Sequence, residues 1–430
     1  MRKPRPCASC ASVTRRGFLQ ATAAASAAAL VANLAPSRAY AAGSDTVRVG
    51  LVGCGGRGTG AARNCVDSAP GVRLVALADL FQDRVDAFKA TVAKWGDKAD
   101  VKDDHCFVGF DAYQRLVDLP DVDLVLLVTP PGFRPLHFKA AVDAGKHVFF
   151  EKPVAVDPVG VRSVLATSEA AAAKKLSVVA GTVYRRHPHH REVYKRVKDG
   201  QIGDLVGGQV YFLTGELWYH DRKPEWSDVE WQCRNWLYHV WLSGDHIVEQ
   251  HVHDLDVMAW FLGGPPTKCI GMGGRQSRTD PKFGDIYDHF AIEYEYANGA
   301  RISSMCRQVN RTADRITQRF VGTQGVACPK EGLIMGANPY KYEGEDWDPF
   351  VREHADLVAS IRQGEPINEG RQIATSSLIA IMGRVAAYTG REISWKWTLE
   401  ASKLDLAPSK YEFGERPVGP VAVPGQTPLV

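Results

Sequence analysis

The sequence of 430 residues predicts an α/β protein with two differently built domains behind a leader segment. Three observations support this fold class. Strand and helix patterns alternate from Val47 to Gly181, a glycine-rich turn follows the first strand, and period-two strand patterns dominate beyond Thr182. With 45% hydrophobic and 23% charged residues, the composition excludes collagen-like, disordered and multi-span membrane proteins.

The first 42 residues have the features of an export signal. A twin-arginine motif (TRRGFLQ) occupies residues 14–20, an Ala-rich apolar stretch covers 21–35, and Ala39-Tyr40-Ala41 fits a cleavage site. The apolar stretch is short and rich in Ala and Ser, which favours a cleaved signal over a stable membrane anchor. We therefore expect the twin-arginine translocation machinery to export the folded chain to the periplasm or another exported location.

Charge and cysteine content limit the partners. The leader holds six basic and no acidic residues while the whole chain carries +3, so the remainder is slightly acidic. A chain without a basic stripe is not expected to bind nucleic acid. Two of the nine cysteines lie in the leader, and the others lack metal-ligand spacing, so we expect neither a structural disulfide nor a metal site.

A dinucleotide-binding motif follows the first expected strand, Val47–Val52. Residues 53–58 read G-C-G-G-R-G, which is the spacing G-x-G-x-x-G, and a helix pattern covers 59–67. The glycines permit a tight turn, close approach of a pyrophosphate and close helix–strand packing, and the helix start supplies free N–H groups. A second strand over 73–78 ends at Asp79, whose carboxylate suits a ribose 2′-hydroxyl and repels a 2′-phosphate. These features predict NAD in preference to NADP.

The alternation continues through three further strand patterns over 123–129, 146–150 and 177–181. Helix patterns over 135–144 and 157–175 separate them. Such repeated units predict a parallel, doubly wound sheet, that is, a Rossmann domain over residues 43–181. Its ligands are expected beyond the carboxyl ends of the strands.

The second domain is expected over residues 182–395. Its period-two strand patterns predict an antiparallel sheet with one covered face. A helix pattern from about 244 to 262 places Glu249 and His253 four residues apart on one helix face. A carboxylate beside an imidazole suits general acid–base chemistry. His251 and His253 point to opposite sides of such a helix, which disfavours a shared metal ion.

Several of these motifs together resemble one known family. The glycine motif, Asp79, Glu151-Lys152-Pro153, Tyr184-Arg185-Arg186 and residues 252–256 (VHDLD) are similar to the glucose–fructose oxidoreductase/inositol dehydrogenase (Gfo/Idh/MocA) family over about residues 46–395. The resemblance implies a nicotinamide cofactor, a polyhydroxylated substrate and an open, mostly antiparallel second sheet. We also expect the chain to form a homo-oligomer. It also implies that Lys152 and His253 handle the proton of the reacting hydroxyl, with Glu249 where the family has Asp. The cofactor contacts expected on this basis are Gly53, Gly55, Gly56, Arg57, Gly58, Asp79, Thr129, Pro130, His137, Glu151, Lys152 and Arg186.

Two further segments carry weaker signals. Residues 211–241 hold five of the ten tryptophans, and aromatic faces stack on sugars but also build cores and interfaces. Within this segment Arg234 and Trp236 are the expected substrate contacts, beside Lys152 and His253. Helices within 348–390 are expected to pack back on the first domain, as in the resembling family. The proline-rich residues 396–430 are expected to form an extended tail or a disordered end.

The expected activity is hydride transfer between nicotinamide and a hydroxyl carbon of a sugar, glycoside or cyclitol. Because free NAD is scarce outside the cytoplasm, an exported enzyme is expected to hold its cofactor tightly. One alternative is a glycosidase or lyase that uses NAD transiently, although resembling proteins of that type carry E-V-P where this chain has Glu151-Lys152-Pro153. Another is a catalytically inactive carbohydrate-binding protein, which the presence of both Lys152 and His253 disfavours.

Overall fold

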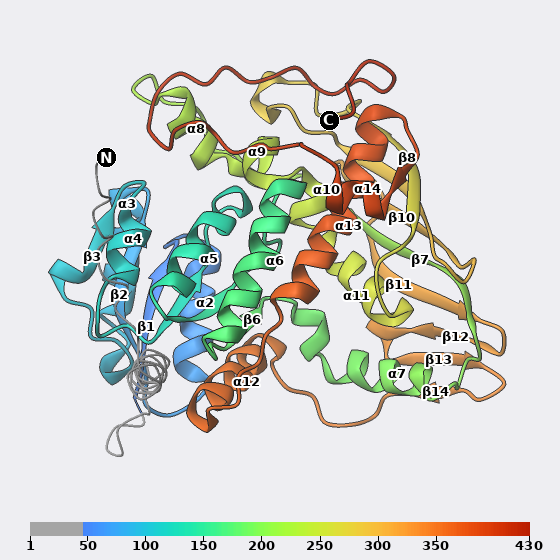
Figure 1. Cartoon of the computed structure of the whole chain (residues 1–430), viewed down its shortest axis with the longest axis horizontal. Coiled ribbons are helices and arrows are strands. Elements are labelled where there is room, and N and C mark those ends of the chain that lie inside the picture. The colour runs from blue at the N-terminus through green and yellow to red at the C-terminus, as the bar shows by residue number, and fades with distance from the viewer. Residues whose placement is uncertain (1–45) are drawn as a thin grey trace, which may run out of the picture. The chain divides into compact units, whose positions relative to one another are not determined.

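The structure is a computed structural model that describes residues 46–430 (Figure 1). Its first sheet has six parallel strands in the order β3-β2-β1-β4-β5-β6. The strands are β1 (Val47–Val52), β2 (Val72–Asp79), β3 (Cys106–Val108), β4 (Leu124–Leu127), β5 (His147–Phe150) and β6 (Val178–Ala180). The strand order reverses between β1 and β4, where doubly wound sheets bind dinucleotides. The predicted Rossmann-like first domain is confirmed.

Helices cover both faces of this sheet. The helices α2 (Gly56–Asp67), α3 (Gln82–Val92) and α12 (Pro349–Gln363) share one apolar core with the strands. On the other face lie α4 (Ala112–Val117), α5 (Arg134–Asp143) and α6 (Pro158–Ala173). The helix α12 comes from far along the chain, and its residues Leu357, Val358 and Ile361 are buried in that first core.

The second sheet has nine strands in the order β14-β13-β12-β11-β7-β10-β9-β8-β15. All neighbours for which pairs are resolved are antiparallel except β7 and β10. The strands are β7 (Leu205–Thr214), β8 (Lys268–Gly274), β9 (His289–Glu295), β10 (Arg301–Gln308), β11 (Arg315–Gly322), β12 (Gly325–Cys328), β13 (Leu333–Gly336), β14 (Tyr340–Lys341) and β15 (Ile393–Ser394). The mostly antiparallel second sheet is therefore also confirmed.

Helices cover one face of this sheet. In β9 the side chains of Phe290, Ile292 and Tyr294 are buried and alternate with partly exposed ones, as period two requires. The helices α7 (Pro188–Lys198), α11 (Val252–Leu262) and α13 (Gly370–Thr389) contact the sheet. Both α11 and α13 lie between the two sheets in Figure 1, and α13 also contacts α6 of the first domain.

The helix expected from 244 to 262 is interrupted. Its first part is α10 (His246–Glu249), and α11 begins only at Val252. Gln250 between them has φ −115° and ψ −55°, which departs from helical geometry. The interruption changes how the side chains of Glu249 and His253 lie relative to each other.

Short helices and an extended arm complete the described chain. The helices are α8 (Asp228–Arg234), α9 (Val240–Ser243) and α14 (Trp395–Glu400). Residues 401–430 then run as the extended red trace at the top of Figure 1. This arm contacts both domains: Leu406 N donates to Asp157 Oδ2 at 2.9 Å, and Tyr287 Oη donates to the carbonyl of Ala422 at 2.9 Å.

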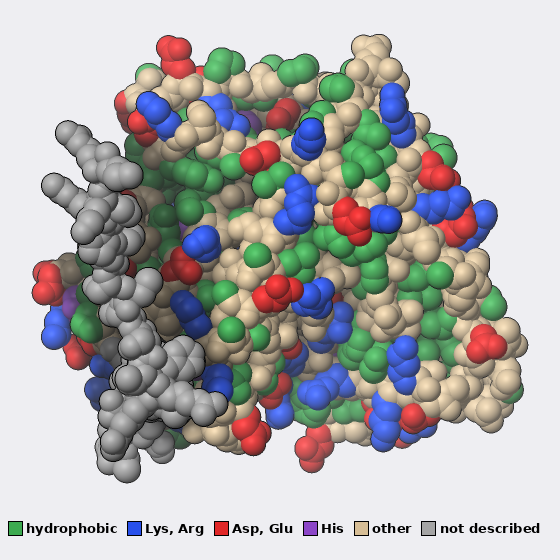
Figure 2. Space-filling model, in the orientation of Figure 1, with side chains coloured by type: hydrophobic (Ala, Val, Ile, Leu, Met, Phe, Trp, Pro, Cys, Tyr) green, Lys and Arg blue, Asp and Glu red, His purple; other side chains and the backbone are tan. Residues whose placement is uncertain are grey.

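Figure 2 shows acidic and basic side chains interspersed over one face of the molecule. Within residues 46–430, no helix has the length and apolar character needed to span a membrane. The same residues contain no cluster of His, Cys, Asp and Glu suited to a metal ion, and their seven cysteines are free thiols. The export signal and its cleavage site lie outside the described residues.

Candidate active site and dinucleotide groove

The glycine loop between β1 and α2 is shaped to receive a phosphate. Gly53 has φ +105°, and a Cβ at Gly58 would meet the carbonyl oxygen of Gly53 at 1.8 Å. These two glycines are therefore required by the backbone itself. Gly55 and Gly56 have only open space where a Cβ would project. No side chain caps the start of α2 and its first turn holds no acid, so its N–H groups remain available to an anion.

Asp79 closes the end of β2 beside this loop. Its carboxylate accepts from Cys54 N at 2.7 Å and from Phe81 N at 3.0 Å, which fixes its orientation. Burial raises the pKa of Asp79 above its ordinary value, and the two N–H donors and the charge of Arg84 oppose that rise. Each carboxylate oxygen has a further lone pair, so Asp79 can still accept from a ribose hydroxyl.

A groove with a cavity volume of about 470 Å³ runs past the loop and Asp79. That volume lies within the range typical of ligand sites. Nine of the residues expected at the cofactor line it: Gly53, Gly55, Gly56, Arg57, Gly58, Asp79, Thr129, Pro130 and His137. The uncapped N–H groups, the open space at Gly55 and the carboxylate of Asp79 together fit a dinucleotide.

Three other expected cofactor residues do not line this groove. Glu151 is buried and pairs with the guanidinium of Arg57, holding that side chain at the glycine loop. Arg57 also lies 3.7 Å from the buried carboxylate of Glu353, which the sequence analysis missed. Arg186 forms ion pairs with Asp356 at 3.0 Å and Glu369 at 2.7 Å, so its charge is neutralised by α12 and the start of α13. The expected contact of Arg186 with the cofactor stays a prediction.

Lys152, the third of those residues, lies just beyond β5. Its Nζ donates to the backbone carbonyl of Glu249 at 2.6 Å. Burial lowers the pKa of Lys152 below its ordinary value, and the carboxyl groups of Glu249 and Glu151 partly oppose that effect. A lysine in these surroundings releases its proton more readily than a solvated one.

His253 lies in the first turn of α11 and is half-buried. Its ring centroid is 5.3 Å from that of Tyr184, and neither ring nitrogen has a hydrogen-bond partner among residues 46–430. Burial and the positive charges of Lys152 and Arg57 hold the pKa of His253 well below its ordinary value. The imidazole is therefore neutral near pH 7 and free to take or give a proton.

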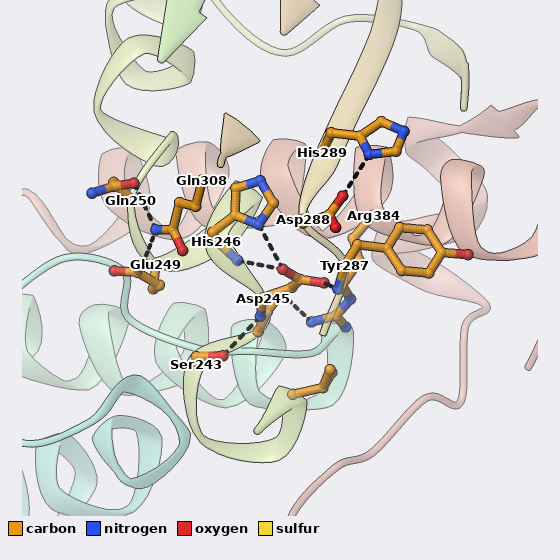
Figure 3. A network of polar contacts seen from close by, with 12 residues as sticks. Ser243, Asp245, His246, Glu249, Gln250, Tyr287, Asp288, His289, Gln308 and Arg384 are labelled. Atoms are coloured by element: carbon orange, nitrogen blue, oxygen red, sulfur yellow. Dashed lines mark hydrogen bonds and ion pairs between the residues drawn. The ribbon is translucent and has the colours of Figure 1, made fainter. Parts of the chain in front are cut away.

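The expected pairing of Glu249 with His253 is not formed. Because the helix breaks at Gln250, the carboxyl group of Glu249 instead accepts from Gln308 Nε2 at 3.4 Å (Figure 3). The same amide donates to Gln250 Oε1 at 2.8 Å. Burial raises the pKa of Glu249 to about 7, although the charge of Lys152 opposes the rise. Glu249 is thus a buried acid close to Lys152 rather than a partner that orients His253.

Asp245 anchors this region and was missed by the sequence analysis. It has φ +73° and ψ +163°, a conformation that few residues other than glycine adopt. Its buried carboxylate accepts from the backbone and ring nitrogens of His246 and from Tyr287 N at 2.8 Å (Figure 3). It also accepts from Tyr388 Oη at 2.6 Å. Arg384 donates to the neighbouring Gly244 carbonyl at 2.8 Å. These bonds hold the start of α10, whose last carbonyl receives Lys152.

Arg134 is a second missed residue. This buried guanidinium donates to the carbonyls of Thr129 and Pro153, and so ties together the segments that follow β4 and β5. Burial lowers its pKa to about 10, which leaves it charged at neutral pH. An arginine at the start of a helix ordinarily indicates a solvated charge, so its position in the sequence gave no signal.

Arg234 and Trp236, the expected substrate contacts, lie on the wall of the dinucleotide groove. Arg234 pairs with Asp83 at 3.1 Å and Glu230 at 3.0 Å, and its guanidinium lies 3.9 Å from the ring centroid of Phe81. Its donors are therefore largely engaged by the protein. Both residues line the groove together with Asp79, whereas Lys152 and His253 do not line it, and their contact with a substrate stays a prediction.

The fold and the groove define the class: an oxidoreductase with a Rossmann domain that binds NAD-type dinucleotides. Two successive family models match, "Oxidoreductase family, NAD-binding Rossmann fold" over residues 47–181 and "GFO/IDH/MocA C-terminal domain" over residues 190–328. Together they cover more than half of the chain. The protein belongs to the Gfo/Idh/MocA family.

Individual relatives agree with this assignment. The chain is 25% identical over 284 residues to the scyllo-inositol 2-dehydrogenase (NAD(+)) of Bacillus subtilis, covering 65% of this chain and 72% of the relative. It is 27% identical over 378 residues to a glycosyl hydrolase family 109 protein of Shewanella amazonensis, covering 79% and 78%. The aldose–aldose oxidoreductase of Caulobacter crescentus shares the fold, with a TM-score of 0.63 at 19% identity over 81% of this chain and 99% of that one.

Proposed function

We propose that this chain oxidises or reduces a hydroxyl-bearing carbon of a sugar, glycoside or cyclitol with NAD as cofactor. The observation that carries the proposal is a half-buried Lys152, whose Nζ lies 2.6 Å from the Glu249 carbonyl and whose charge acts on a neutral His253 without a hydrogen-bond partner in the described chain. Two groups able to exchange a proton thus serve one site. The inositol dehydrogenase relative supports the substrate class.

The residues divide the proton chemistry between them. When bound, the nicotinamide supplies the acceptor or donor of hydride. During oxidation the neutral amine of Lys152 takes the proton of the reacting hydroxyl, and during reduction its ammonium returns the proton; burial makes this exchange easier because it renders the ammonium more acidic than usual. His253, neutral at pH 7, hydrogen-bonds the same oxygen and is the alternative acceptor for that single proton. Glu249 keeps Lys152 in place through its backbone carbonyl.

Asp79 supports NAD over NADP. Its buried carboxylate, fixed by two backbone N–H donors, suits a ribose 2′-hydroxyl and would repel a 2′-phosphate. Arg84, a positive charge, also lines the groove. The preference for NAD over NADP is therefore tested by measuring the affinity of the chain for each nucleotide.

We further propose that the protein is exported by the twin-arginine route and carries its cofactor with it. The motif at residues 14–20 and the cleavage sequence at 39–41 support export. An enzyme that works where free NAD is scarce must regenerate the cofactor in place, for example by oxidising one sugar and reducing another.

The proposal is tested with purified full chain, a panel of aldoses and cyclitols, and the absorbance of reduced nicotinamide. The wild-type chain is expected to reduce NAD with at least one polyol, or to oxidise one sugar while reducing another. Lys152→Ala is expected to lower kcat about a hundredfold or more, because it removes a general acid–base. Lys139→Ala, which changes an exposed lysine paired only with Asp143, is the matched control. Equal rates in Lys152→Ala and the control would contradict the proposal.

A second candidate function is a glycosidase that oxidises, eliminates and re-reduces its sugar. The similarity to a glycosyl hydrolase family 109 protein over 79% of this chain favours this second function. An aryl glycoside separates the two functions. Release of the phenol without net change in the redox state of NAD would establish the glycosidase, and its absence, with sugar oxidation observed, would establish the dehydrogenase.

A further inference from the structure

The groove is walled on one side by segments that do not belong to the Rossmann domain. Its lining includes Trp218, His220, Cys233, Arg234 and Trp236 from the connection after β7, and Tyr411 from the C-terminal arm. We call residues 218–236 and 411–416 the groove cover. No sequence motif of dinucleotide-binding proteins includes these segments, and the sequence analysis assigned part of them to the substrate.

The cover meets the first domain at the Asp79 end of the groove. Arg234 pairs with Asp83 in the first turn of α3 and lies 3.9 Å from the ring centroid of Phe81, two residues beyond Asp79. The pyrophosphate belongs at the glycine loop and the adenosine ribose at Asp79. The cover therefore lies over the adenosine half of the bound cofactor.

The arm contributes a second set of contacts at the same end. The ring of Phe413 lies 6.1 Å from Phe81 and 5.0 Å from Phe110, measured between ring centroids. Tyr411 lies 5.7 Å from Phe133. These aromatic side chains close the groove against the loops that follow β2, β3 and β4.

The two segments of the cover are bonded to each other. Val229 N donates to the Gly414 carbonyl at 3.2 Å, and Arg416 N donates to Asp228 Oδ2 at 3.0 Å. Gln232 Nε2 donates to the carbonyl of Arg416 at 2.5 Å. The arm and α8 therefore form one bonded unit, which the Arg234–Asp83 pair and the Phe413 ring contacts both hold against the first domain.

The cavity between cover and sheet is chemically suited to adenine. Its wall holds aromatic side chains from both sides, which offer flat faces on which a base stacks. They are Phe81, Phe110, Tyr113 and Phe133 from the first domain, and Trp218, Trp236 and Tyr411 from the cover. Arg234 brings little free charge to the wall, because Asp83 and Glu230 engage its guanidinium.

We infer that the groove cover closes over the adenosine half of the dinucleotide, so that the chain retains its cofactor between turnovers instead of exchanging it. The inference rests on the dinucleotide binding of the proposed function, but not on the identity of the substrate. It makes Phe413, Arg234 and Asp83 determinants of cofactor release.

The test measures nucleotide release and needs no sugar. Full-length protein is purified without added nucleotide, its NAD content is determined after denaturation, and release is followed by trapping free NAD with an excess of a soluble dehydrogenase and its substrate. About one NAD per chain with slow release is expected for the wild type. Phe413→Ala is expected to accelerate release about tenfold or more, since it removes two aromatic contacts from a side chain that is 45% exposed and not needed for the core.

Matched variants test whether the change in NAD release comes from the groove cover. Val423→Ala removes an equally exposed apolar side chain from the same arm, away from the groove, and is expected to release NAD at the wild-type rate. Arg234→Ala, Asp83→Ala and the double variant form a double-mutant cycle. Each single change is expected to accelerate NAD release, and the double variant is expected to release NAD more slowly than the sum of the two single effects on the release barrier would give. Slow release that Phe413→Ala and Arg234→Ala leave unchanged would overturn the inference.

The outcomes separate this inference from the proposed function. A wild-type chain that binds added NAD but exchanges it within seconds refutes the cover and leaves the dehydrogenase standing. A chain that binds no NAD at any concentration refutes both. Accelerated release in Phe413→Ala together with wild-type behaviour in Val423→Ala supports the cover, whichever substrate is found.

Discussion

Glu249 and His253 show how one residue between two others can change a site. Four residues apart in a continuous helix, they would form a carboxylate–imidazole pair. The non-helical Gln250 separates them, so the carboxyl group of Glu249 lies beside Gln308 in the second sheet. The spacing of the two residues is visible in the sequence. The break is not, because the groups bonded there come from distant parts of the chain: Lys152 donates to the Glu249 carbonyl and Gln308 donates to the side chain of Gln250.

The raised pKa of Glu249 predicts a pH-dependent stability. Its pKa rises from an ordinary value of 4.5 to about 7 in the folded chain, so the folded state binds this proton more tightly than the unfolded state. The corresponding stabilisation is fully present below pH 4.5 and is lost as the pH rises through about 7. Glu249→Gln, which stays neutral, is therefore expected to gain stability over the wild type as the pH rises.

The size of that gain follows from the same shift. One pKa unit corresponds to about 1.4 kcal/mol, so the difference reaches about 3 kcal/mol above pH 7 and vanishes near pH 4.5. Urea unfolding of both proteins across this range measures it. Glu293→Gln, at a partly exposed position of β9, is the control and is expected to show no such pH trend. A constant difference between Glu249→Gln and wild type at every pH would contradict the assignment.

At the scale of the element, the glycines in the strand–loop–helix unit of β1 and α2 are needed for different reasons. Gly58 must lack a side chain because the backbone of Gly53 lies against it, whereas Gly55 has φ −74° and open space around it. The sequence pattern identifies both glycines as part of one motif. Only the packing distinguishes the glycine that the fold needs from the one that the ligand needs.

This distinction predicts different effects on stability for two alanine substitutions that both weaken NAD binding. Gly58→Ala places a Cβ 1.8 Å from the Gly53 carbonyl oxygen, so it is expected to cost about 1–3 kcal/mol or more and to abolish NAD binding. Gly55→Ala is expected to leave Tm unchanged and to weaken NAD binding about tenfold or more, because its Cβ enters the space of the pyrophosphate. Thermal unfolding and calorimetric titration with NAD measure both quantities. A loss of stability in Gly55→Ala would show that its conformation is structurally required.

At the scale of the whole molecule, buried polar contacts join the two sheets. Arg185, just beyond β6, pairs with Asp256 of α11 at 2.7 Å, and Ser376 of α13 donates to the same carboxylate at 2.7 Å. Asp256 is only 2% exposed. The motif analysis left the role of Arg185 open, and the structure assigns it to this junction.

Breaking this junction is expected to destabilise the chain without touching the groove. Asp256→Asn leaves the guanidinium of Arg185 without its counter-charge in a buried place, which typically costs about 3–5 kcal/mol. Affinity for NAD is expected to stay at the wild-type value, because neither residue lines the groove. Glu169→Gln removes an exposed pair with Arg371 and is expected to have no measurable effect on stability. Equal unfolding midpoints for the two variants would refute the role of the junction.

The sequence alone determined the doubly wound first domain, the glycine loop and the place of Asp79 at the end of the second strand, because these depend on local periodicity and on spacing within one βα unit. Tertiary structure alone decided which groups Glu249, Arg186 and Arg234 face. It also revealed Asp245, Arg134 and the groove cover, whose residues lie far apart in the chain. The positions of the groove-cover residues follow from packing between α8, the arm and the loops of the first sheet. No local pattern encodes such contacts, since each is stabilised by partners that only the folded chain brings within reach.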